Sequence, residues 1–298
     1  MTLRDLYARD RLTFSIEFFP PRTDEAVENL FRELEVLKRL DPAFCSVTYG
    51  AGGSTQERTV EIAKRIRRDA GIEIMCHLTI VNQPRSQVEA VLEDMYVNGV
   101  HNFIALAGDP PGGPAAEWSA HPDGYRHSSE LVEAAQRMYP GWFSIAVAGF
   151  PEVHPRAKSR ALDLAYLKQK VDSGADVVIT QLFFDNDDYF RFVEELRALG
   201  VTVPIVPGVL PIRSAAQCRR FTSLCGARIP PRLDALLAKV EHDDEAAVEL
   251  GIEYCSEQCQ GLLDFGVPGL HFYSLNRARS VVAIHENLDL GALRAAAG

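Results

Sequence analysis

Apolar runs and amphipathic stretches alternate along nearly the whole chain of 298 residues. Each apolar run has the length of one strand, and each amphipathic stretch spaces its apolar residues three and four apart, as on one face of a helix. The pattern predicts eight strands, at residues 14–19, 44–49, 72–79, 102–107, 142–149, 176–184, 203–209 and 270–275. It predicts helices at 23–40, 55–69, 85–98, from 128, and at 159–173, 187–199, 214–224 and 277–286, with extra helical segments at 232–240 and 244–265.

The predicted strands are uninterrupted apolar runs, which is typical of parallel strands covered by helices on their outer face. Eight strand–helix units favour an α/β fold of the (β/α)8 TIM-barrel type, with one helical insertion before the eighth strand. An open, doubly wound sheet is the alternative, but no G-x-G-x-x-G motif follows any strand. Because no linker-like change in composition occurs, we expect residues 1–298 to form a single domain.

One acidic residue, Glu17, lies inside the first apolar run, which ends at Pro20 and Pro21. A carboxylate among apolar residues is expensive to ionise, so it is either paired or kept protonated for a purpose. A structural role, with an arginine or backbone donors holding the carboxylate, is as compatible with this run as a catalytic one.

Polar residues also follow the other predicted strands. In a (β/α)8 barrel the carboxyl ends of the strands form the active-site rim. The residues that we expect there are Glu17, Thr48, His77, Asp109, His154, Gln181, Asn276 and Arg277. Each has a structural alternative, such as a hydrogen-bonded core histidine at position 77, a turn-forming Asp109, or an Arg277 that neutralises an acid across the rim. Together they suit the binding of a large polar cofactor, with one acid for proton transfer.

Composition and spacing exclude several other classes of protein. The net charge of −10, from 31 basic and 41 acidic residues, argues against bulk nucleic-acid binding. No G-x-S-x-G nucleophile motif occurs, and neither the scattered histidines nor the six cysteines have the spacing of a metal site. We expect buried thiols, no membrane span and, because the first residues lack an apolar signal core, a cytoplasmic protein.

Seven motifs at the predicted strand ends resemble those of the methylenetetrahydrofolate reductases, in their bacterial single-domain form. They are S-I-E-F-F-P-P-R (15–22), S-V-T-Y-G-A-G-G-S (46–54), G-D-P-P (108–111), P-E-V-H-P-R-A-K-S (151–159), T-Q-L-F-F-D (180–185), V-P-G-V-L-P (206–211) and H-F-Y-S-L-N-R (271–277). The resemblance covers residues 14–285 and implies a barrel that binds FAD non-covalently. NADH or NADPH would reduce the flavin, whose N5 would then pass hydride to 5,10-methylenetetrahydrofolate, giving 5-methyltetrahydrofolate.

The resemblance also implies roles for individual residues. Glu17 would be the general acid that assists protonation at folate N10, with Phe14, Ile16, Phe18 and Phe19 raising its pKa. Asp109 would lie beside the flavin and the folate, disfavouring extra negative charge on the reduced flavin and stabilising the cationic iminium form of the folate. The expected folate-binding residues are Glu17, Gln181, Gln217, Phe221 and Arg277; Gln181 would bind the pterin, and Phe221 would stack on the nicotinamide or the aminobenzoyl ring.

For FAD, the resemblance implies binding by Thr48, His77, Leu106, Gly108, Asp109, His127, Ser128, Ala148, His154, Asp163 and Lys170. The chain departs from the family at Ala107, where an arginine is usual, and at His127, where a tyrosine is usual; Arg156 or Lys170 would compensate for the lost cation. Phe150, Tyr166 and Gln169 also replace more polar or basic residues. Bacterial relatives favour NADH without excluding NADPH, and we expect a homo-oligomer. A flavin-free pterin-binding methyltransferase and a non-catalytic binding barrel are the alternatives.

Overall fold

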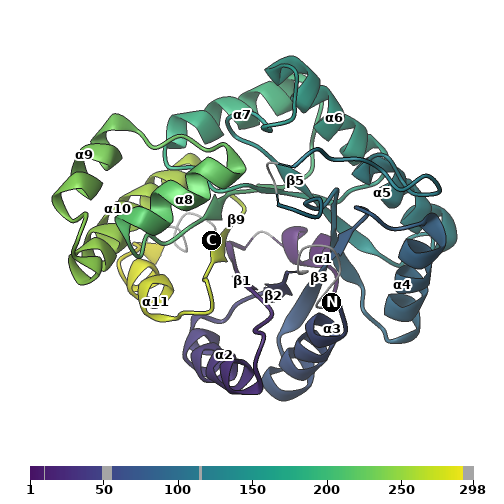
Figure 1. The fold of residues 1–298 in the computed structure, drawn as a ribbon, viewed down its shortest axis with the longest axis horizontal. Coiled ribbons are helices and arrows are strands. Elements are labelled where there is room, and N and C mark those ends of the chain that lie inside the picture. Colours follow the sequence, from purple (N-terminus) through teal and green to yellow (C-terminus); the bar gives the residue numbers. More distant parts are fainter. Residues whose placement is uncertain (10, 49–55, 114–115, 291–298) are drawn as a thin grey trace.

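The structure is a computed structural model, and it describes residues 1–9, 11–48, 56–113 and 116–290. Within these residues, nine parallel strand segments form one sheet that curls into a barrel at the centre of the molecule (Figure 1). The segments are β1 (Thr13–Phe18), β2 (Phe44–Val47), β3 (Glu73–Thr79), β4 (Asn102–Leu106), β5 (Ser144–Gly149), β6 (Val177–Thr180), β7 (Ile205–Val206), β8 (Gly208–Val209) and β9 (Gly269–Tyr273).

The barrel closes through the segment that holds β7 and β8. These two strands are consecutive pieces of one run, interrupted at Pro207, which has no N–H to donate to a neighbouring strand. β7 pairs with β6, β8 pairs with β9, and the Pro207 carbonyl accepts a hydrogen bond from the backbone N–H of His271 at 3.0 Å. Because β9 also pairs with β1, the ring is complete. The predicted eight-unit barrel is confirmed, with its seventh strand in two pieces.

Helices follow the strands as predicted and surround the barrel (Figure 1). They are α2 (Asp24–Leu37) with the 3-10 turn η1 (Lys38–Leu40), α3 (Gln56–Arg65) with the π-helical turn η3 (Ile66–Ala70), α4 (Arg85–Val97), α5 (Ser128–Met138), α6 (Arg160–Asp172), α7 (Asn186–Ala198), α8 (Ala215–Cys225), α9 (Pro231–Lys239), α10 (Asp244–Phe265) and α11 (Arg279–Glu286). The start that the sequence analysis expects for α3, residue 55, lies outside the described residues.

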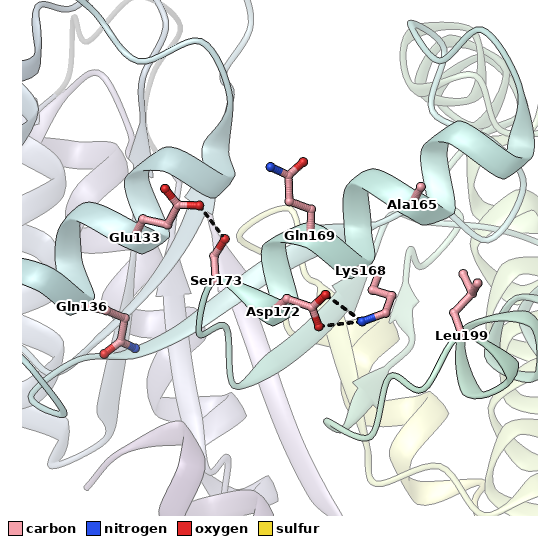
Figure 2. Close-up of a pocket in the computed structure, with 8 residues that line it drawn as sticks. All are labelled: Glu133, Gln136, Ala165, Lys168, Gln169, Asp172, Ser173 and Leu199. Atoms are coloured by element: carbon pink, nitrogen blue, oxygen red, sulfur yellow. Dashed lines mark hydrogen bonds and ion pairs between the residues drawn. The ribbon is translucent and has the colours of Figure 1, made fainter.

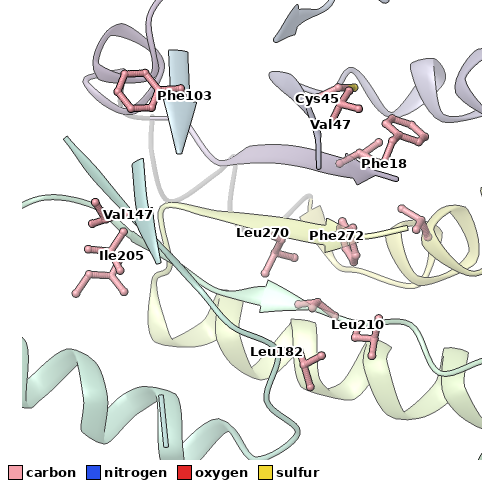
Figure 3. Packing of buried hydrophobic residues seen from close by; sticks show 14 of the residues in the cluster. Phe18, Cys45, Val47, Phe103, Val147, Leu182, Ile205, Leu210, Leu270 and Phe272 are labelled. Carbon is pink, nitrogen blue, oxygen red and sulfur yellow. The ribbon is translucent and has the colours of Figure 1, made fainter. Parts of the chain in front are cut away.

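Side chains along each strand alternate between the two faces of the barrel wall. The outward face, which includes Phe18, Val47, Phe103 and Phe272, belongs to the large core between the strands and the helices (Figure 3). The inward face forms a second, smaller apolar cluster, made of Phe44, Met75, Ile104, Ala146, Val177, Ile179 and Val206 with Leu3 and Leu6. Each uninterrupted apolar run in the sequence therefore supplies side chains to two separate cores, one on each face of the barrel wall.

The sequence analysis missed a short helix at the start of the chain, α1 (Leu3–Tyr7). Leu3 and Leu6 insert into the inner cluster, so α1 closes the amino-terminal end of the barrel. The backbone N–H of Leu3 donates to Asn102 Oδ1 at 2.8 Å, and that of Arg4 donates to Ser144 Oγ at 2.9 Å. Strand side chains thus satisfy two of the free donors that every helix start presents.

The helical insertion before the last strand is confirmed as α9 and α10. α10 braces the segment that follows β6, because the Tyr254 hydroxyl donates to Phe184 O at 2.7 Å and Gln258 Nε2 donates to Phe183 O at 2.8 Å. The insertion therefore supports the loop that begins at Gln181. Across the described part of the chain, no helix combines the length and hydropathy needed to cross a membrane.

The predicted strand at 176–184 is too long, since β6 ends at Thr180 and residues 181–184 form the supported loop. Of the six cysteines, five are buried as expected, and Cys225 is only partly buried. None of the six forms a disulfide.

Candidate active site

The Glu17 side chain points into the barrel and meets polar groups from three other strands. Its Oε2 lies 3.1 Å from His77 Nε2 and 3.6 Å from His271 Nε2. Ser46 Oγ donates a hydrogen bond to the same oxygen at 3.3 Å. The strand register explains the grouping, because Ser46 of β2 and Tyr273 of β9 stand opposite Glu17 of β1. Only 7% of the Glu17 surface is exposed, so the carboxyl faces these partners rather than bulk water.

The structure contradicts the expected apolar setting of Glu17. Ile16 and Phe18 face the helices, as the alternation of side chains along a strand requires. Phe14 packs against the same outer core, and Phe19 lies beyond the strand with 36% of its surface exposed. The aromatic run therefore builds the outer wall of the barrel and does not surround the carboxyl.

The pKa of Glu17 accordingly differs from the raised value that the sequence suggested. Burial acts to raise the pKa of the carboxyl, but the charge of His77, the hydrogen-bonding contributions of His271 and His77 and the charge of His271 outweigh it and lower the pKa to about 2. The expectation of a stored carboxyl proton is therefore wrong. The physical reason is that two histidines, from β3 and from the neighbouring strand β9, lie beside the carboxyl, where phenyl rings were expected.

A turn after β9 holds the end of β1 in place. Leu275 and Asn276 both adopt left-handed backbone conformations, with φ of 52° and 57°. Asn276 Nδ2 donates to Phe19 O at 2.9 Å, and its Oδ1 accepts from Phe19 N at 2.8 Å. Ser274 Oγ donates to the backbone O of Glu17 at 2.6 Å. Left-handed conformations of non-glycine residues are costly and persist where surrounding contacts fix them, often at functional sites.

The motif S-L-N-R thus anchors the residue that carries the acid, and its last member lies at the surface. Arg277 is exposed and pairs with Glu33 of α2, with 3.3 Å between Nη1 and Oε1. Glu33 also accepts from the backbone N–H of Ala278 at 2.7 Å, at the start of α11. Arg277 therefore has an acid partner at the rim, and that acid is Glu33.

A second polar group gathers after β5. Lys170 Nζ donates to Ala148 O at 2.8 Å, and Asp163 Oδ2 accepts from the backbone N–H of His154 at 2.9 Å. Burial lowers the pKa of Lys170 to about 8, while the charge of Asp163 acts in the opposite direction. Asp163 and Lys170 lie seven residues apart on α6 and share a face, as the sequence indicated. The structure brings these four predicted cofactor residues together.

Asp109 is exposed on the loop after β4, and its charge acts on His154 and Arg156 of the neighbouring loop. The Arg156 guanidinium lies over the Trp118 ring, 5.7 Å from its centroid. A cation therefore stands beside Asp109 although residue 107 is alanine, and the compensation expected from Arg156 stays a prediction.

Glycine at position 108 is required by close packing. Its φ is +82°, and a Cβ there would lie 2.7 Å from Val81 Cγ1 and 2.9 Å from Thr79 Cβ. Any side chain would push the loop away from β3. The G-D-P-P motif thus sets where Asp109 leaves the barrel wall.

The other predicted cofactor residues occupy strand ends and helix starts. Thr48 follows β2 and is buried, Leu106 ends β4, and Ser128 begins α5. His127 is exposed and stacks on Tyr166 of α6, with 6.2 Å between ring centroids and 16° between planes. His127 and Tyr166, which both depart from the family pattern, are therefore in contact. Residues 49–54 of the S-V-T-Y-G-A-G-G-S motif lie outside the described part of the chain.

Of the predicted folate residues, Gln181 lies just after β6, and Gln217 and Phe221 lie on α8. The backbone N–H of Gln181 donates to Gly149 O at 2.7 Å, and its side-chain Oε1 accepts from Leu182 N at 2.9 Å. Gln217 Oε1 accepts from Arg213 N at 3.0 Å, while its buried Nε2 has no hydrogen-bond partner among the described residues. Phe221 is partly buried and packs against the outer core. The side-chain NH2 of Gln217 is therefore available to donate to a ligand.

A large open groove lies elsewhere, on the outside of the barrel between α5 and α6 (Figure 2). It measures about 690 Å³; Ser173 Oγ donates to Glu133 of α5, and Lys168 pairs with Asp172 along α6. Among the described residues, its lining shares no member with the predicted site. We therefore do not assign the chemistry to it.

We call Glu17, His77 and the polar residues around them inside the barrel the inner group. Sequence reasoning missed four of its members: Ser15, Ser46, His271 and Tyr273. Three of them face inward on strands that were correctly placed, at even spacings from Glu17 or opposite it. Counting alternate residues along the first strand gives Ser15. Without the pairing register, however, nothing in the sequence says that His271 stands next to Ser15.

The donor set fits a dinucleotide cofactor. A mostly buried ammonium, an exposed guanidinium and a histidine lie together at the ends of β4 and β5, and such groups bind phosphate oxygens. Holding the Lys170 charge out of water is unfavourable without an anionic partner, since Asp163 only partly offsets the burial. These residues would hold the phosphates of such a cofactor.

Comparisons with known proteins agree with the motifs. The family model described as "Methylenetetrahydrofolate reductase" matches residues 2–289. "Methylenetetrahydrofolate reductase (NADH) 1" of Zea mays is 40% identical over 289 residues, which are 94% of this chain and 49% of the plant protein. "5,10-methylenetetrahydrofolate reductase" of Escherichia coli is 37% identical over 280 residues, covering 94% of this chain and 92% of the bacterial protein.

The chain spans about half the length of the plant relatives that it matches. A solved structure with the same fold has a TM-score of 0.63 at 15% identity and covers 96% of this chain and 97% of its own. It is a protein from Clostridium thermocellum described as binding two copies of 5-methyl-5,6,7,8-tetrahydrofolic acid. From the family match and the relatives, we conclude that this chain belongs to the methylenetetrahydrofolate reductase family.

Proposed function

We propose that this protein reduces 5,10-methylenetetrahydrofolate to 5-methyltetrahydrofolate, with FAD as bound cofactor and NADH as the preferred reductant. The observation that carries the proposal is the buried Glu17 with its two histidines inside the barrel of a chain from this family. The names of the plant relatives support NADH over NADPH. We further propose that residues 1–298 act as one catalytic barrel and that the protein forms a homo-oligomer.

The residues after β4 and β5 would bind the cofactor. Lys170, His154 and Arg156 supply the positive and donor groups, Asp163 orients the His154 backbone, and Gly108 lets the loop pass close to β3. The chemistry that FAD supplies when bound is hydride transfer from the nicotinamide to the methylene carbon of the folate. Asp109 would favour the cationic iminium form of the folate through its negative charge.

The residues of the inner group would bind the proton and transfer it to the folate. Opening the folate's five-membered ring requires a proton at N10, and Glu17 is the acid at the active-site end of β1. Because its pKa is low, Glu17 acts as the last carrier of a proton that its neighbours supply. Gln181 and the free Nε2 of Gln217 would hydrogen-bond the folate, and Phe221 would stack on an aromatic ring. The folate ligand of the Clostridium thermocellum protein of similar fold agrees with a pterin-binding barrel.

The test is reconstitution of the purified protein with FAD, followed by assays with NADH and with NADPH. We expect a flavin absorption band, bleaching of that band by NADH, and NADH-dependent formation of 5-methyltetrahydrofolate. Protein that stays colourless after FAD is added contradicts the proposal and favours a flavin-free pterin methyltransferase. Flavin that NADH reduces but the folate never reoxidises contradicts the proposed substrate.

A further inference from the structure

His271 is the most deeply buried ionisable group beside Glu17, with 1% of its surface exposed. Its Nδ1 lies 2.8 Å from Ser15 Oγ, and its Nε2 lies 3.6 Å from Glu17 Oε2. The ring is also nearly parallel to the Phe44 ring, with 6.0 Å between centroids. Three contacts from two strands therefore fix the ring with one nitrogen aimed at the carboxyl.

The hydrogen bonds around Ser15 restrict where protons can sit. The Ser15 hydroxyl can donate to Leu270 O, 3.5 Å away, and then its oxygen accepts from Nδ1–H of His271. In that arrangement Nε2 has a proton only if the ring is the imidazolium. A neutral ring would place a lone pair against the lone pairs of an ionised Glu17. The Glu17–His271 pair is therefore stable when it holds one proton between Nε2 and Oε2.

Three further groups face Glu17, and the nearest of them, His77, also lowers the pKa of Glu17 through its charge. Tyr273 is kept neutral because burial and the charge of Glu17 raise its pKa well above the usual value, and its hydroxyl donates to Thr180 O at 2.6 Å. Ser46 is a hydroxyl donor that does not titrate. His77 contacts the carboxyl at 3.1 Å, but its Nε2 does not form a hydrogen bond of proper geometry among the described residues.

We propose that His271, held by Ser15, is a positioning residue that stores the proton which Glu17 delivers to the folate. In each turnover the Nε2–H bond of the imidazolium breaks as an O–H bond forms on Glu17. That O–H bond then breaks as N10–H forms on the folate. After product release, hydronium from solvent returns one proton to the pair through Glu17, so protons balance and no electrons move. The substrate named in this proposal rests on the proposed function. The pairing of His271 with Glu17 does not.

The pairing is tested first without cofactor. In protein carrying ¹³C-labelled glutamate carboxyls, the Glu17 signal, assigned by its loss in Glu17→Gln, is followed against pH. We expect His271→Gln to raise the pKa of Glu17, because burial is then opposed by fewer partners. His242→Gln serves as the matched control, since His242 is exposed on the loop between α9 and α10. An unchanged pKa in His271→Gln overturns the proposal.

The proton supply is tested with FAD-loaded protein in the two half-reactions. We expect His271→Gln to slow the folate step by about 10-fold or more, a part of the 10²–10⁴-fold that acid catalysis contributes, while flavin reduction by NADH is unchanged. We expect the pH profile of the folate step to differ between the wild type and His271→Gln, and identical profiles overturn the proposal.

Ser15→Ala covers the case in which His271→Gln fails to fold. It removes only the contact to Nδ1, so we expect a smaller loss in the folate step and an altered pH profile. A Ser15→Ala profile identical to that of the wild type counts against the proposal. If the wild type itself lacks a folate step, the proposed function fails, while the carboxyl titration still decides whether His271 pairs with Glu17.

Discussion

At the scale of single residues, the site depends on two ionisable groups held away from water. Glu17 is kept ionised by histidines, and Lys170 is kept near Ala148 and Asp163 although burial disfavours its charge. Both groups have shifted pKa values, Glu17 through its two histidines and Lys170 through burial, and such shifts are common where a protein binds charged ligands or moves protons. Under the proposed function, Glu17 would serve the folate and Lys170 would serve an anionic cofactor.

Lys170 predicts how stability depends on pH. Its pKa falls from the usual 10.5 to about 8 in the folded protein, so between these values the unfolded chain binds more protons than the folded one. Stability should therefore rise with pH across this window relative to Lys170→Met. Urea unfolding at several pH values measures it, with Lys168→Met, whose ammonium pairs with Asp172 on the same helix, as control. Parallel stability curves for wild type and Lys170→Met between pH 8 and 10.5 would contradict the burial of this charge.

At the scale of elements, the turn after β9 is the part that ties the end of β1 to its neighbouring strand at the active-site rim. Ser274 and Asn276 bond the backbone of Glu17 and Phe19, so the last strand fixes the end of the first. Asn276 is suited to this place, because asparagine tolerates the left-handed conformation better than most residues. Leu275 in the same conformation is under strain, which these hydrogen bonds hold in place.

Replacing Asn276 should weaken the positioning of Glu17 as well as lower the stability of the fold. Asn276→Ala removes two hydrogen bonds to Phe19 and the side chain that favours the left-handed backbone, so we expect a loss of about 2 kcal/mol in unfolding free energy. The folate step should slow more than flavin reduction does. Asn98→Ala, at the end of α4, is the control and should change stability by less. Equal effects of the two variants would show that the turn does not hold β1.

At the scale of the whole molecule, the barrel has two cores and is closed at one end by α1. Leu3 is completely buried in the inner cluster, and the ammonium of Met1 pairs with Glu73 at 2.7 Å. The active-site end contains the polar residues, while the opposite end is sealed by apolar and hydrogen-bonded contacts. This agrees with the usual division of (β/α)8 barrels into a catalytic face and a stabilising face.

Shortening a buried side chain of α1, the helix that closes the barrel, should destabilise the protein without altering the chemistry. We expect Leu3→Ala to lower the unfolding free energy by about 2–5 kcal/mol, the range for fully buried leucines. Leu199→Ala, at a leucine with 41% of its surface exposed, should cost about 0.5 kcal/mol. Denaturant unfolding of both variants measures the difference. A Leu3→Ala protein as stable as Leu199→Ala would mean that α1 does not seal the barrel.

Much of this architecture could be predicted from sequence, because strand and helix periodicities are local. The eight units, the insertion before β9 and the shared face of Asp163 and Lys170 all follow from spacing along the chain. The surroundings of Glu17 could not be predicted, since they depend on which strands become neighbours. His271 and Ser15 are 256 residues apart in sequence, and only closure of the ring brings them together. The five residues of α1 are too few to show a helical period.

The central claim is that Glu17 delivers the proton for folate reduction. Anaerobic stopped-flow of FAD-loaded wild type and Glu17→Gln tests it most directly, because NADH reduction of the flavin and its reoxidation by 5,10-methylenetetrahydrofolate can be followed separately. We predict equal reduction by NADH in both proteins and a folate step that is slower by about 10² or more in Glu17→Gln. An unchanged folate step, or an equal loss in both half-reactions, would contradict the account.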